Sequence, residues 1–539
     1  MFMNLQKYYA TALMLLIGAL PFLFVPVSSL AGSSGLVETN LKIFLFGVLS
    51  CFMLALAWRK RYGKFLVLPV IVVMTLCTTL SVACRALYGG EANLFAVDSV
   101  LSSNLSEAWE MMSSHLWIVV LGIGLLVGHC VSIAIMANVL PVKWLRRGGI
   151  SFLLLLAVQH GWYLRHNGRE HYPIAVLTLT KTPLFNVGHV LRLVQDRKEI
   201  GDAVPPPVHF DAGHDTSSID TFVIVLGESA RRKQLALYGY GRDTSPRVQA
   251  DAQRMIIFDK AHSAAPVTTI AVPLSLSRVV DKKGSPDNIL RIANMAGFGT
   301  YWLSRQDKYG VYDNKVTALA RFAREKTWIG QGNDEALLPH LRQALAKPGK
   351  KLIVLHLTGS HVDACKRYPQ QAAYFQDGAD INLNCYDNSV RYTDMVLGSI
   401  FDVLRTRNAS LMYFSDHGQE WEALPDSRFY HGAVSPSKEA YEVPMFIWYS
   451  PVVSASERRT GRFHPNYSTA FNYYLIRHWM GIADPRDRCL SVLEPCFKGA
   501  DPDWVLDGNN QPLQFDQLPA SKRIVNPVIR TAMARSAPR

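Results

Sequence analysis

Long apolar runs dominate the first third of this 539-residue sequence and limit the folds that are open to it. A helix that crosses a bilayer needs roughly twenty predominantly apolar residues. Runs near that length cover residues 9–30, 41–58, 65–84, 116–140 and 150–164. We therefore expect an N-terminal helical bundle of about five transmembrane spans within residues 1–165. Small residues at 28–32 would also suit a signal-peptide cleavage site, but the spans that follow favour a retained helix.

Basic clusters in two connecting segments predict the orientation of these spans. Residues 59–64 and 143–147 are rich in Lys and Arg, whereas residues 31–40 and 89–114 carry no such cluster. Positively charged connectors stay in the cytoplasm. The N-terminus is then cytoplasmic, and residues 166–539, beyond the fifth span, lie on the opposite side of the membrane.

The net charge of +13 fits lipid head groups better than nucleic acid. Basic residues gather in the cytoplasmic connectors, in juxtamembrane stretches and in the C-terminal tail, where anionic lipids would attract them. We therefore expect no nucleic-acid partner. Within the spans, His129 and the pair Gln159-His160 are polar, and we favour a hydrogen bond between helices over a path for a lipid substrate.

Half of the eight cysteines lie in the predicted spans, where a small buried hydrophobic residue is the simplest interpretation. The other four lie in the extracytoplasmic part, whose oxidising environment favours disulfides. We expect Cys365 to pair with Cys385 and Cys489 with Cys496. The sequence also permits the other pairings.

Beyond the membrane part, residues 166–219 mix amphipathic stretches with three consecutive prolines at 205–207, which is typical of a connector on the membrane surface. From residue 220 onwards, short β-rich runs alternate with segments of helical length. The expected strands cover residues 222–226, 255–258, 300–303, 352–357, 411–414 and 445–449. Such alternation predicts an α/β sheet with helices on both faces.

Reactive side chains follow several of these strands. Glu228 comes just after the first, His361 after the fourth, and Asp416 and His417 directly after the fifth; His431 follows downstream. Each residue alone suits a helix cap or a polar surface. Because sites in such sheets gather beyond the carboxyl ends of the strands, the group as a whole indicates a metal site. An adjacent carboxylate and imidazole can supply two ligands of zinc.

Five stretches in this order resemble the alkaline phosphatase superfamily, and within it the membrane-bound phosphoethanolamine transferases that modify lipid A or the lipopolysaccharide core. The stretches are Gly227-Glu228-Ser229-Ala230-Arg231, residues 238–246 (YGYGRDTSP), Gly359-Ser360-His361, Tyr386-Asp387-Asn388 with Tyr392-Thr393-Asp394, and Phe414-Ser415-Asp416-His417-Gly418. The resemblance covers nearly the whole chain. It implies that residues 220–539 form a periplasmic, sulfatase-like, metal-dependent catalytic domain of the alkaline-phosphatase-like α/β sandwich type.

The resemblance also implies a role for each candidate residue. Thr268 matches the nucleophile, with Thr269 as the alternative, in the stretch that ends at Val272-Pro273. The implied zinc ligands are Glu228, Thr268, Asp416 and His417. His361 and His431 would contact phosphate, protonate the leaving alkoxide or hold a second ion, so the number of zinc ions stays open. Arg305 and Gln306 lie in a loop where relatives place substrate-contacting groups.

The implied reaction transfers phosphoethanolamine from phosphatidylethanolamine to lipopolysaccharide through a covalent threonine intermediate. The enzyme would be a monomer in the Gram-negative inner membrane. Ala264 and Leu274 stand where many members of the lipid A branch have a disulfide, and Val362 follows His361, so the chain is more similar to the branch that acts on core sugars.

Four alternatives use the same fold. A polyglycerolphosphate synthase shares the spans and the threonine, and a phosphodiesterase would use water as the acceptor. A non-catalytic membrane scaffold would have lost the ligands, which are all present. A sulfatase is disfavoured because residues 264–273 contain no cysteine.

Overall fold

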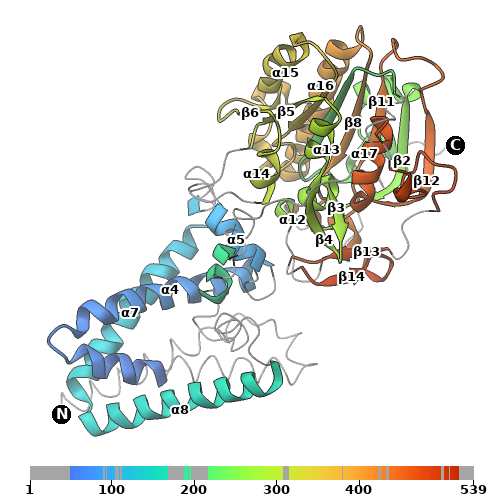
Figure 1. Ribbon diagram of the computed structural model, residues 1–539. Coiled ribbons are helices and arrows are strands. Elements are labelled where there is room, and N and C mark those ends of the chain that lie inside the picture. Colours follow the sequence, from blue (N-terminus) through green and yellow to red (C-terminus); the bar gives the residue numbers. More distant parts are fainter. Residues whose placement is uncertain are drawn as a thin grey trace. The chain divides into compact units, whose positions relative to one another are not determined.

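The computed structural model in Figure 1 forms two units, residues 1–198 and 199–539, each described separately below. The structure describes Ala92, Trp109, Met112, Ser113 and residues 49–88, 94–102, 115–167, 187–191, 193–195, 217–306, 315–378, 380–422, 427–431, 436–482, 484–498, 503–508 and 510–520. The connector predicted at 166–219 lies largely outside this set and stays a prediction.

The first unit tests the expectation of about five spans only in part. In its described residues, two helices are long and apolar enough to cross a membrane, within α4 (Gly63–Tyr88) and α7 (Leu116–Val139). The predicted span at 9–30 lies outside the described residues, and the one at 41–58 is described only from residue 49, as the shorter apolar helix Leu49–Trp58. The run at 150–164 lies in α8 (Val142–Asn167). That helix is long enough to cross a membrane but is less apolar on average. Basic residues precede its apolar stretch, and Gln159, His160 and Arg165 follow it.

Helices α4 and α7 pack through apolar side chains such as Ile71, Met74 and Ile133, while many other apolar side chains of both helices are exposed, as expected for contact with lipid. His129 of α7 is buried. Its Nδ1 lies 2.9 Å from the Leu125 carbonyl and 3.3 Å from the Thr75 hydroxyl of α4. The expected hydrogen bond between helices is therefore present at His129. The side chains of Gln159 and His160 lie outside the described residues.

The second unit is built on a mixed sheet of eight strands. In spatial order they are β12 (Gly461–Ser468), β2 (Met255–His262), β11 (Met445–Tyr449), β8 (Ala409–Ser415), β1 (Thr221–Gly227), β7 (Lys351–His356), β5 (Gly299–Ser304) and β6 (Glu325–Trp328). All run parallel except β11, which is antiparallel to its two neighbours. The six predicted strands are present, and β6 and β12 extend the sheet at its two edges.

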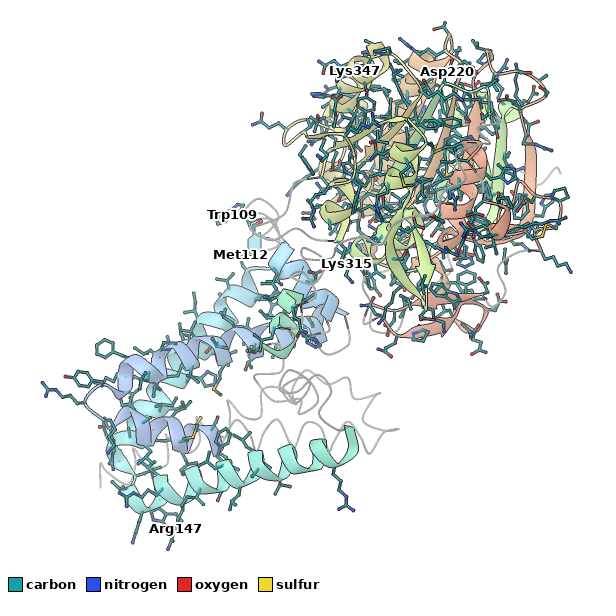
Figure 2. All side chains as sticks on the ribbon, viewed as in Figure 1. Trp109, Met112, Arg147, Asp220, Lys315 and Lys347 are labelled. Atoms are coloured by element: carbon teal, nitrogen blue, oxygen red, sulfur yellow. A yellow bond between two sulfur atoms is a disulfide. The ribbon has the colours of Figure 1, made fainter. Side chains whose placement is uncertain are left out.

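Helices cover both faces of this sheet, as Figures 1 and 2 show. Alternate residues of β1 point to opposite faces: Phe222, Ile224 and Leu226 join one core cluster, and Val223 and Val225 the other. The first core includes α12 (Thr268–Leu276), α13 (Ile289–Met295), α14 (Lys315–Ala320) and α17 (Asn472–Trp479). The second includes α11 (Pro246–Ala250), α15 (Leu337–Ala346) and α16 (Ile381–Leu404). The predicted α/β sandwich is confirmed.

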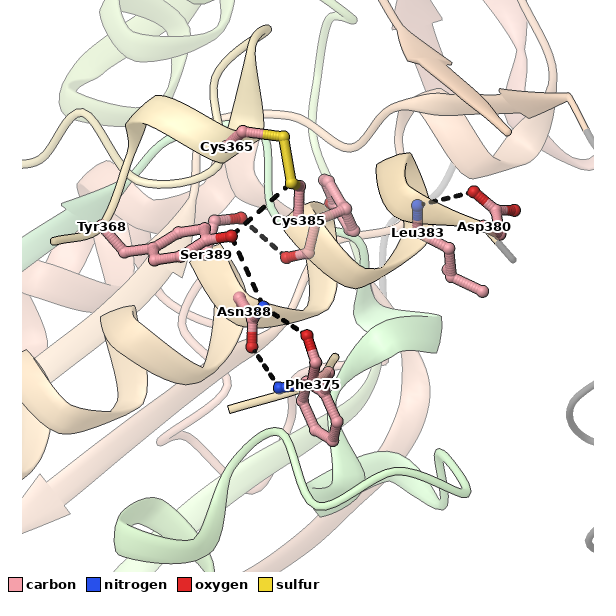
Figure 3. Close-up of a disulfide and its surroundings, with 9 residues drawn as sticks. Cys365, Tyr368, Phe375, Asp380, Leu383, Cys385, Asn388 and Ser389 are labelled. Atoms are coloured by element: carbon pink, nitrogen blue, oxygen red, sulfur yellow. Dashed lines mark hydrogen bonds between the residues drawn. A yellow bond between two sulfur atoms is a disulfide. The ribbon is translucent and has the colours of Figure 1, made fainter. Parts of the chain in front are cut away.

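Three hairpins lie outside the sheet: β3 (Ser277–Val280) with β4 (Lys283–Asn288), β9 (Glu420–Glu422) with β10 (Arg428–Tyr430), and β13 (Trp504–Leu506) with β14 (Pro512–Gln514). Both predicted disulfides are present, Cys365–Cys385 and Cys489–Cys496. The first, drawn in Figure 3, joins the loop after β7 to helix α16.

Candidate metal centre and active site

The candidate site forms where parallel strands end at one edge of the sheet. Glu228 follows β1, and Asp416 and His417 follow β8. Because Gly227 of β1 is in register with Ser415 of β8, the residues after them emerge side by side. Thr268 begins α12, a short loop after the end of β2. Chain segments far apart in sequence thus meet beyond the carboxyl ends of the strands.

The four predicted ligands come within contact distance of one another. Thr268 Oγ1 donates a hydrogen bond to Glu228 Oε2 at 3.1 Å and lies 3.3 Å from His417 Nε2. The same imidazole nitrogen lies 3.4 Å from Glu228 Oε1 and 3.4 Å from Asp416 Oδ2. Ligands held about 2.0–2.1 Å from a tetrahedral zinc ion are roughly 3.3 Å apart. The spacing of these atoms therefore fits such an ion.

Two further observations support a cation at this point. Asp416 Oδ2 is buried and accepts no hydrogen bond from the described residues, a costly condition for a carboxylate oxygen unless an ion binds it. His417 Nδ1 lies 2.7 Å from the Gly418 carbonyl, so a proton on Nδ1 would leave the Nε2 lone pair facing the carboxylates. The donor set of carboxylate oxygens, a hydroxyl and an imidazole nitrogen suits zinc.

The protonation of these buried groups reflects their crowding. Burial, and then the charge of Glu228, raises the pKa of Asp416 to about 7. Burial alone would lower the pKa of His417, but the negative charges of Asp416 and Glu228 outweigh it and raise the pKa to about 9. Burial would raise the pKa of Glu228, yet its hydrogen bond to His417 and the charges of nearby histidines hold that pKa well below its ordinary value. A bound cation would favour the ionised carboxylates.

The turn after β1 is shaped to bring these ligands together. Ser229 adopts a left-handed conformation with φ of 57°, so that its amide donates to Asp416 Oδ1 at 3.0 Å and its hydroxyl to Glu228 Oε1 at 2.6 Å. Gly359 packs against the same turn, since a Cβ there would lie 2.7 Å from the Glu228 carbonyl oxygen. This contact explains the glycine of the Gly359-Ser360-His361 motif.

The structure brings both predicted histidines to the same place. The ring centroids of His361 and His431 are 5.5 Å apart, and those of His431 and His417 are 4.8 Å apart. Burial lowers the pKa of His361, and burial with the charges of His417 and His361 lowers that of His431 well below its ordinary value. Both rings are then neutral near pH 7 and able to accept a proton.

Gln306 and Arg305 behave differently from each other. Gln306 Nε2 donates to Glu228 Oε2 at 2.8 Å and to the Leu357 carbonyl at 2.9 Å, so it contacts the ligand cluster directly. The guanidinium of Arg305 instead donates to the carbonyls of Ile329 and Gly332. The structure therefore does not bring the charge of Arg305 to the cluster, and we leave Arg305 out of the substrate contacts proposed below.

Two residues shape the site in ways that were not foreseen, Asp334 outside every motif and Tyr386 within one. Asp334 is buried and accepts hydrogen bonds from the amide and hydroxyl of Thr358, both at 2.8 Å, and from the Gly359 amide at 2.9 Å. Tyr386, quoted above only as part of a motif, donates to the Ser229 carbonyl at 2.7 Å and accepts from the Arg231 amide at 2.9 Å. The predicted strand positions do not reveal either contact, because both contacts join segments that are distant in sequence.

The remaining motifs hold helix α16 against the site. Arg242 Nη1 donates to Asp387 Oδ2 at 2.8 Å and to Asn384 Oδ1 at 2.8 Å. Asp394 accepts from the amides of Arg247 and Val248 at 2.9 and 2.8 Å. The stretch around residues 238–246 and the acidic positions of α16 are therefore partners in one network.

Comparison with known proteins agrees with this geometry. The Sulfatase family model matches residues 220–484. Putative transferases YhbX from Escherichia coli strains O157:H7 and K12 are both 40% identical, over 65% and 68% of this chain and 65% and 69% of theirs. The matches thus span about two thirds of these relatives. Phosphoethanolamine transferase OpgE of E. coli K12 is 35% identical over 42% of this chain and 45% of its own.

Two solved structures share the fold. The integral membrane lipooligosaccharide phosphoethanolamine transferase A of Neisseria meningitidis has 20% identity and a TM-score of 0.64, over 90% of this chain and 96% of its own. The periplasmic domain of EptC from E. coli, in complex with Zn, has 24% identity and a TM-score of 0.51, over 60% of this chain and 99% of its own. The chain belongs to the membrane-bound phosphoethanolamine transferase family of the alkaline phosphatase and sulfatase-like superfamily.

Proposed function

We propose that the protein transfers phosphoethanolamine from phosphatidylethanolamine to a lipopolysaccharide acceptor, a core sugar or lipid A, through a covalent intermediate on Thr268. The supporting observation is the position of the Thr268 hydroxyl, 3.1 Å from Glu228 Oε2 and 3.3 Å from His417 Nε2. Within the described residues, Thr269 makes no hydrogen bond to Glu228 or His417, so Thr268 is the better candidate for the nucleophile.

Glu228, Thr268, Asp416 and His417 would hold one zinc ion. When bound, zinc lowers the pKa of a coordinated hydroxyl and so makes an alkoxide available at neutral pH. Gln306 orients Glu228, and the Gly418 carbonyl orients the His417 ring. These contacts fix the direction of the threonine oxygen before a substrate arrives.

In the first step, the oxygen of Thr268 forms a bond to the donor phosphorus and the bond from phosphorus to the diacylglycerol oxygen breaks. The proton lost by the threonine hydroxyl is matched by the proton that diacylglycerol gains, and neutral His361 or His431 is placed to carry it. In the second step, an acceptor hydroxyl oxygen forms a bond to the phosphorus, the bond from phosphorus to the Thr268 oxygen breaks, and the acceptor's proton returns to the Thr268 hydroxyl.

The donor is a membrane lipid, which agrees with the apolar helices of the first unit. We propose a multi-pass inner-membrane protein with its catalytic unit in the periplasm, where the two disulfides would be stable. Ala264 and Leu274, which leave the nucleophile without a flanking disulfide, favour a core-sugar acceptor over lipid A.

The decisive experiment traps the intermediate on the purified full-length protein. Protein in detergent is mixed with phosphatidylethanolamine whose head group carries an isotopic label, and the peptide containing residue 268 is analysed by mass spectrometry. We expect a labelled phosphoethanolamine adduct on Thr268, no adduct in Thr268→Ala, and an intact adduct in the matched control Thr269→Ala. An adduct that persists in Thr268→Ala would refute the assignment.

The acceptor is identified by mass spectrometry of lipopolysaccharide from cells with and without the gene. A phosphoethanolamine group lost from a core sugar supports the proposal in its preferred form, and one lost from lipid A selects the other acceptor. An adduct that turns over to free phosphoethanolamine, with lipopolysaccharide unchanged, would instead identify a phosphodiesterase.

A further inference from the structure

The hairpin formed by β13 and β14, with the residues that flank it (503–518, here the C-terminal hairpin), lies beyond the region that the Sulfatase family model matches, which ends at residue 484. It nevertheless contacts the loop that leads to the nucleophile (residues 262–267, here the nucleophile loop). The Leu506 amide donates to the Ala264 carbonyl at 2.8 Å. An element outside the shared domain thus binds the backbone of the loop that ends at Thr268.

A buried polar contact strengthens this attachment. His262, the last residue of β2, is fully buried, and its Nε2 lies 2.8 Å from Asp503 Oδ1 at the start of the hairpin, a close polar contact that does not have hydrogen-bond geometry. The imidazole also stacks on Phe515, with ring centroids 4.1 Å apart and planes 10° from parallel. His262 is therefore held by both arms of the C-terminal hairpin, at the point where the chain leaves the sheet for the nucleophile loop.

The same hairpin contacts the segment of Ala440 and Tyr441, which binds the residue after the candidate ligand His417. Tyr441 donates its hydroxyl proton to the Leu506 carbonyl at 3.1 Å, while its own carbonyl accepts from the Ser263 amide at 2.7 Å. The neighbouring Ala440 carbonyl accepts from the Gly418 amide at 2.9 Å. Hydrogen bonds therefore connect the hairpin, through Tyr441 and Ala440, to the nucleophile loop and to the residue after His417.

We infer that the C-terminal hairpin is a clamp that positions the nucleophile loop, with Asp503 and His262 as its positioning residues. This inference rests on the proposed function of Thr268. Neither disulfide of the catalytic unit involves the loop, since one joins residues 365 and 385 and the other residues 489 and 496. The hairpin supplies by hydrogen bonds and ring stacking the restraint that a covalent link would otherwise provide.

The test uses the full-length, zinc-loaded protein and three variants. Asp503→Ala removes the oxygen that faces His262, and Asp503→Asn keeps an oxygen at that position. Asp516→Asn is the matched control, because Asp516 belongs to the same hairpin but is exposed. The first measurement is amide hydrogen exchange of peptides covering residues 262–270, and the second is the rate and donor concentration dependence of adduct formation on Thr268.

We expect Asp503→Ala to speed exchange in the nucleophile loop and to lower the rate of adduct formation about ten-fold, since a small misplacement of reacting groups is costly. The KM for the donor and the zinc content should stay unchanged. For Asp503→Asn, the exchange rate of the loop and the rate of adduct formation should both lie between those of the wild type and Asp503→Ala. For Asp516→Asn, both rates should match those of the wild type. If Asp503→Ala fails to fold, Asp503→Asn carries the comparison.

Unchanged exchange in the loop of the Asp503 variants would overturn the clamp, whatever their activity. Equal slowing by Asp516→Asn would also overturn it, because the effect would then not depend on His262. If the wild type forms no adduct on Thr268, the proposed function fails, while the exchange measurement still decides whether the hairpin restrains the loop.

Discussion

Asp416 and His417 show how neighbouring side chains set each other's protonation at the residue scale. In the metal-free protein both pKa values are raised above their ordinary values, that of Asp416 from 3.8 to about 7 and that of His417 from 6.5 to about 9. Groups of this kind stabilise the fold below their ordinary pKa, and that contribution is lost as the pH rises through the folded-state pKa. The loss falls between pH 3.8 and about 7 for Asp416, and between 6.5 and about 9 for His417.

Zinc binding should therefore become tighter as the pH rises. The ion requires an ionised Asp416 and a neutral His417, so it must displace protons from both groups below their raised pKa values. We expect the zinc dissociation constant to fall between pH 6 and pH 8, as measured by competition with a chromophoric chelator. In Asp416→Asn, which cannot release the carboxyl proton, the pH dependence should be weaker. Affinity that stays constant across this range would contradict the predicted ligands.

Glu228, His361, Asp416 and His417 could be predicted from sequence because each lies in a stretch whose order and spacing are specific, such as Ser415-Asp416-His417-Gly418. Asp334, His262 and Asp503 could not be predicted. Each acts through one or two contacts with segments that are distant in sequence, and nothing in its own neighbourhood marks it. For Arg305 the sequence indicates only a position in a loop, which says nothing about the two carbonyls to which its long side chain donates.

At the scale of elements, helix α16 fastens the loop that carries His361. Ser389 donates to Ser360 Oγ at 2.9 Å, and Asn388 exchanges hydrogen bonds with the backbone of Phe375, as Figure 3 shows. The disulfide Cys365–Cys385 adds a covalent link to the same helix. The position of His361 thus depends on an element that supplies none of the predicted ligands.

Removal of the two disulfides should have different effects. The double change Cys365→Ser and Cys385→Ser should cost about 3 kcal/mol in the free energy of unfolding and slow transfer, because the bridge closes a long loop next to His361. The control, Cys489→Ser with Cys496→Ser, should cost about 2 kcal/mol because its loop is shorter, and transfer by the folded protein should be unaffected. Denaturant unfolding and initial rates check both. Equal slowing in the two variants would indicate a general loss of structure.

The six strands that could be predicted are central or buried ones with continuous apolar runs, for example β1 and β8. The edge strands β6 and β12 were missed for a physical reason. One side of each faces solvent, so their sequences are polar, and β12 contains Pro465 where its register with β2 shifts. An edge strand is defined by its neighbour more than by its own residues.

On the scale of the whole molecule, the unit of residues 199–539 has its own cores on both faces of its sheet. We expect residues 217–520, expressed alone in an oxidising compartment, to fold and to bind zinc. The fragment should form the Thr268 adduct with a short-chain, water-soluble donor, but should be at least about ten-fold slower than the full chain with lipid in bilayers, since it lacks the membrane unit that raises the local donor concentration. Equal rates with both donors would show that the membrane unit does not assist.

The number of spans is tested only in the described residues. The apolar runs of the sequence predicted about five spans. In the described part of the chain, two helices are both long enough and apolar enough to cross a membrane. The run at 150–164 was counted without its surroundings. A helix enters a bilayer as a whole, so the charged and polar groups at both ends of α8 matter as much as its middle.

Because the C-terminal hairpin follows every candidate reactive group in the sequence, it sets an order of events during biosynthesis. Residues 503–518 leave the ribosome after every reactive group has been made, and only then can Leu506 bind Ala264 and Asp503 meet His262. A product cut short before residue 503 would therefore carry the complete set of reactive groups with a loosely held threonine. Under the proposed function, synthesis past residue 518 is then a condition for full reactivity of Thr268.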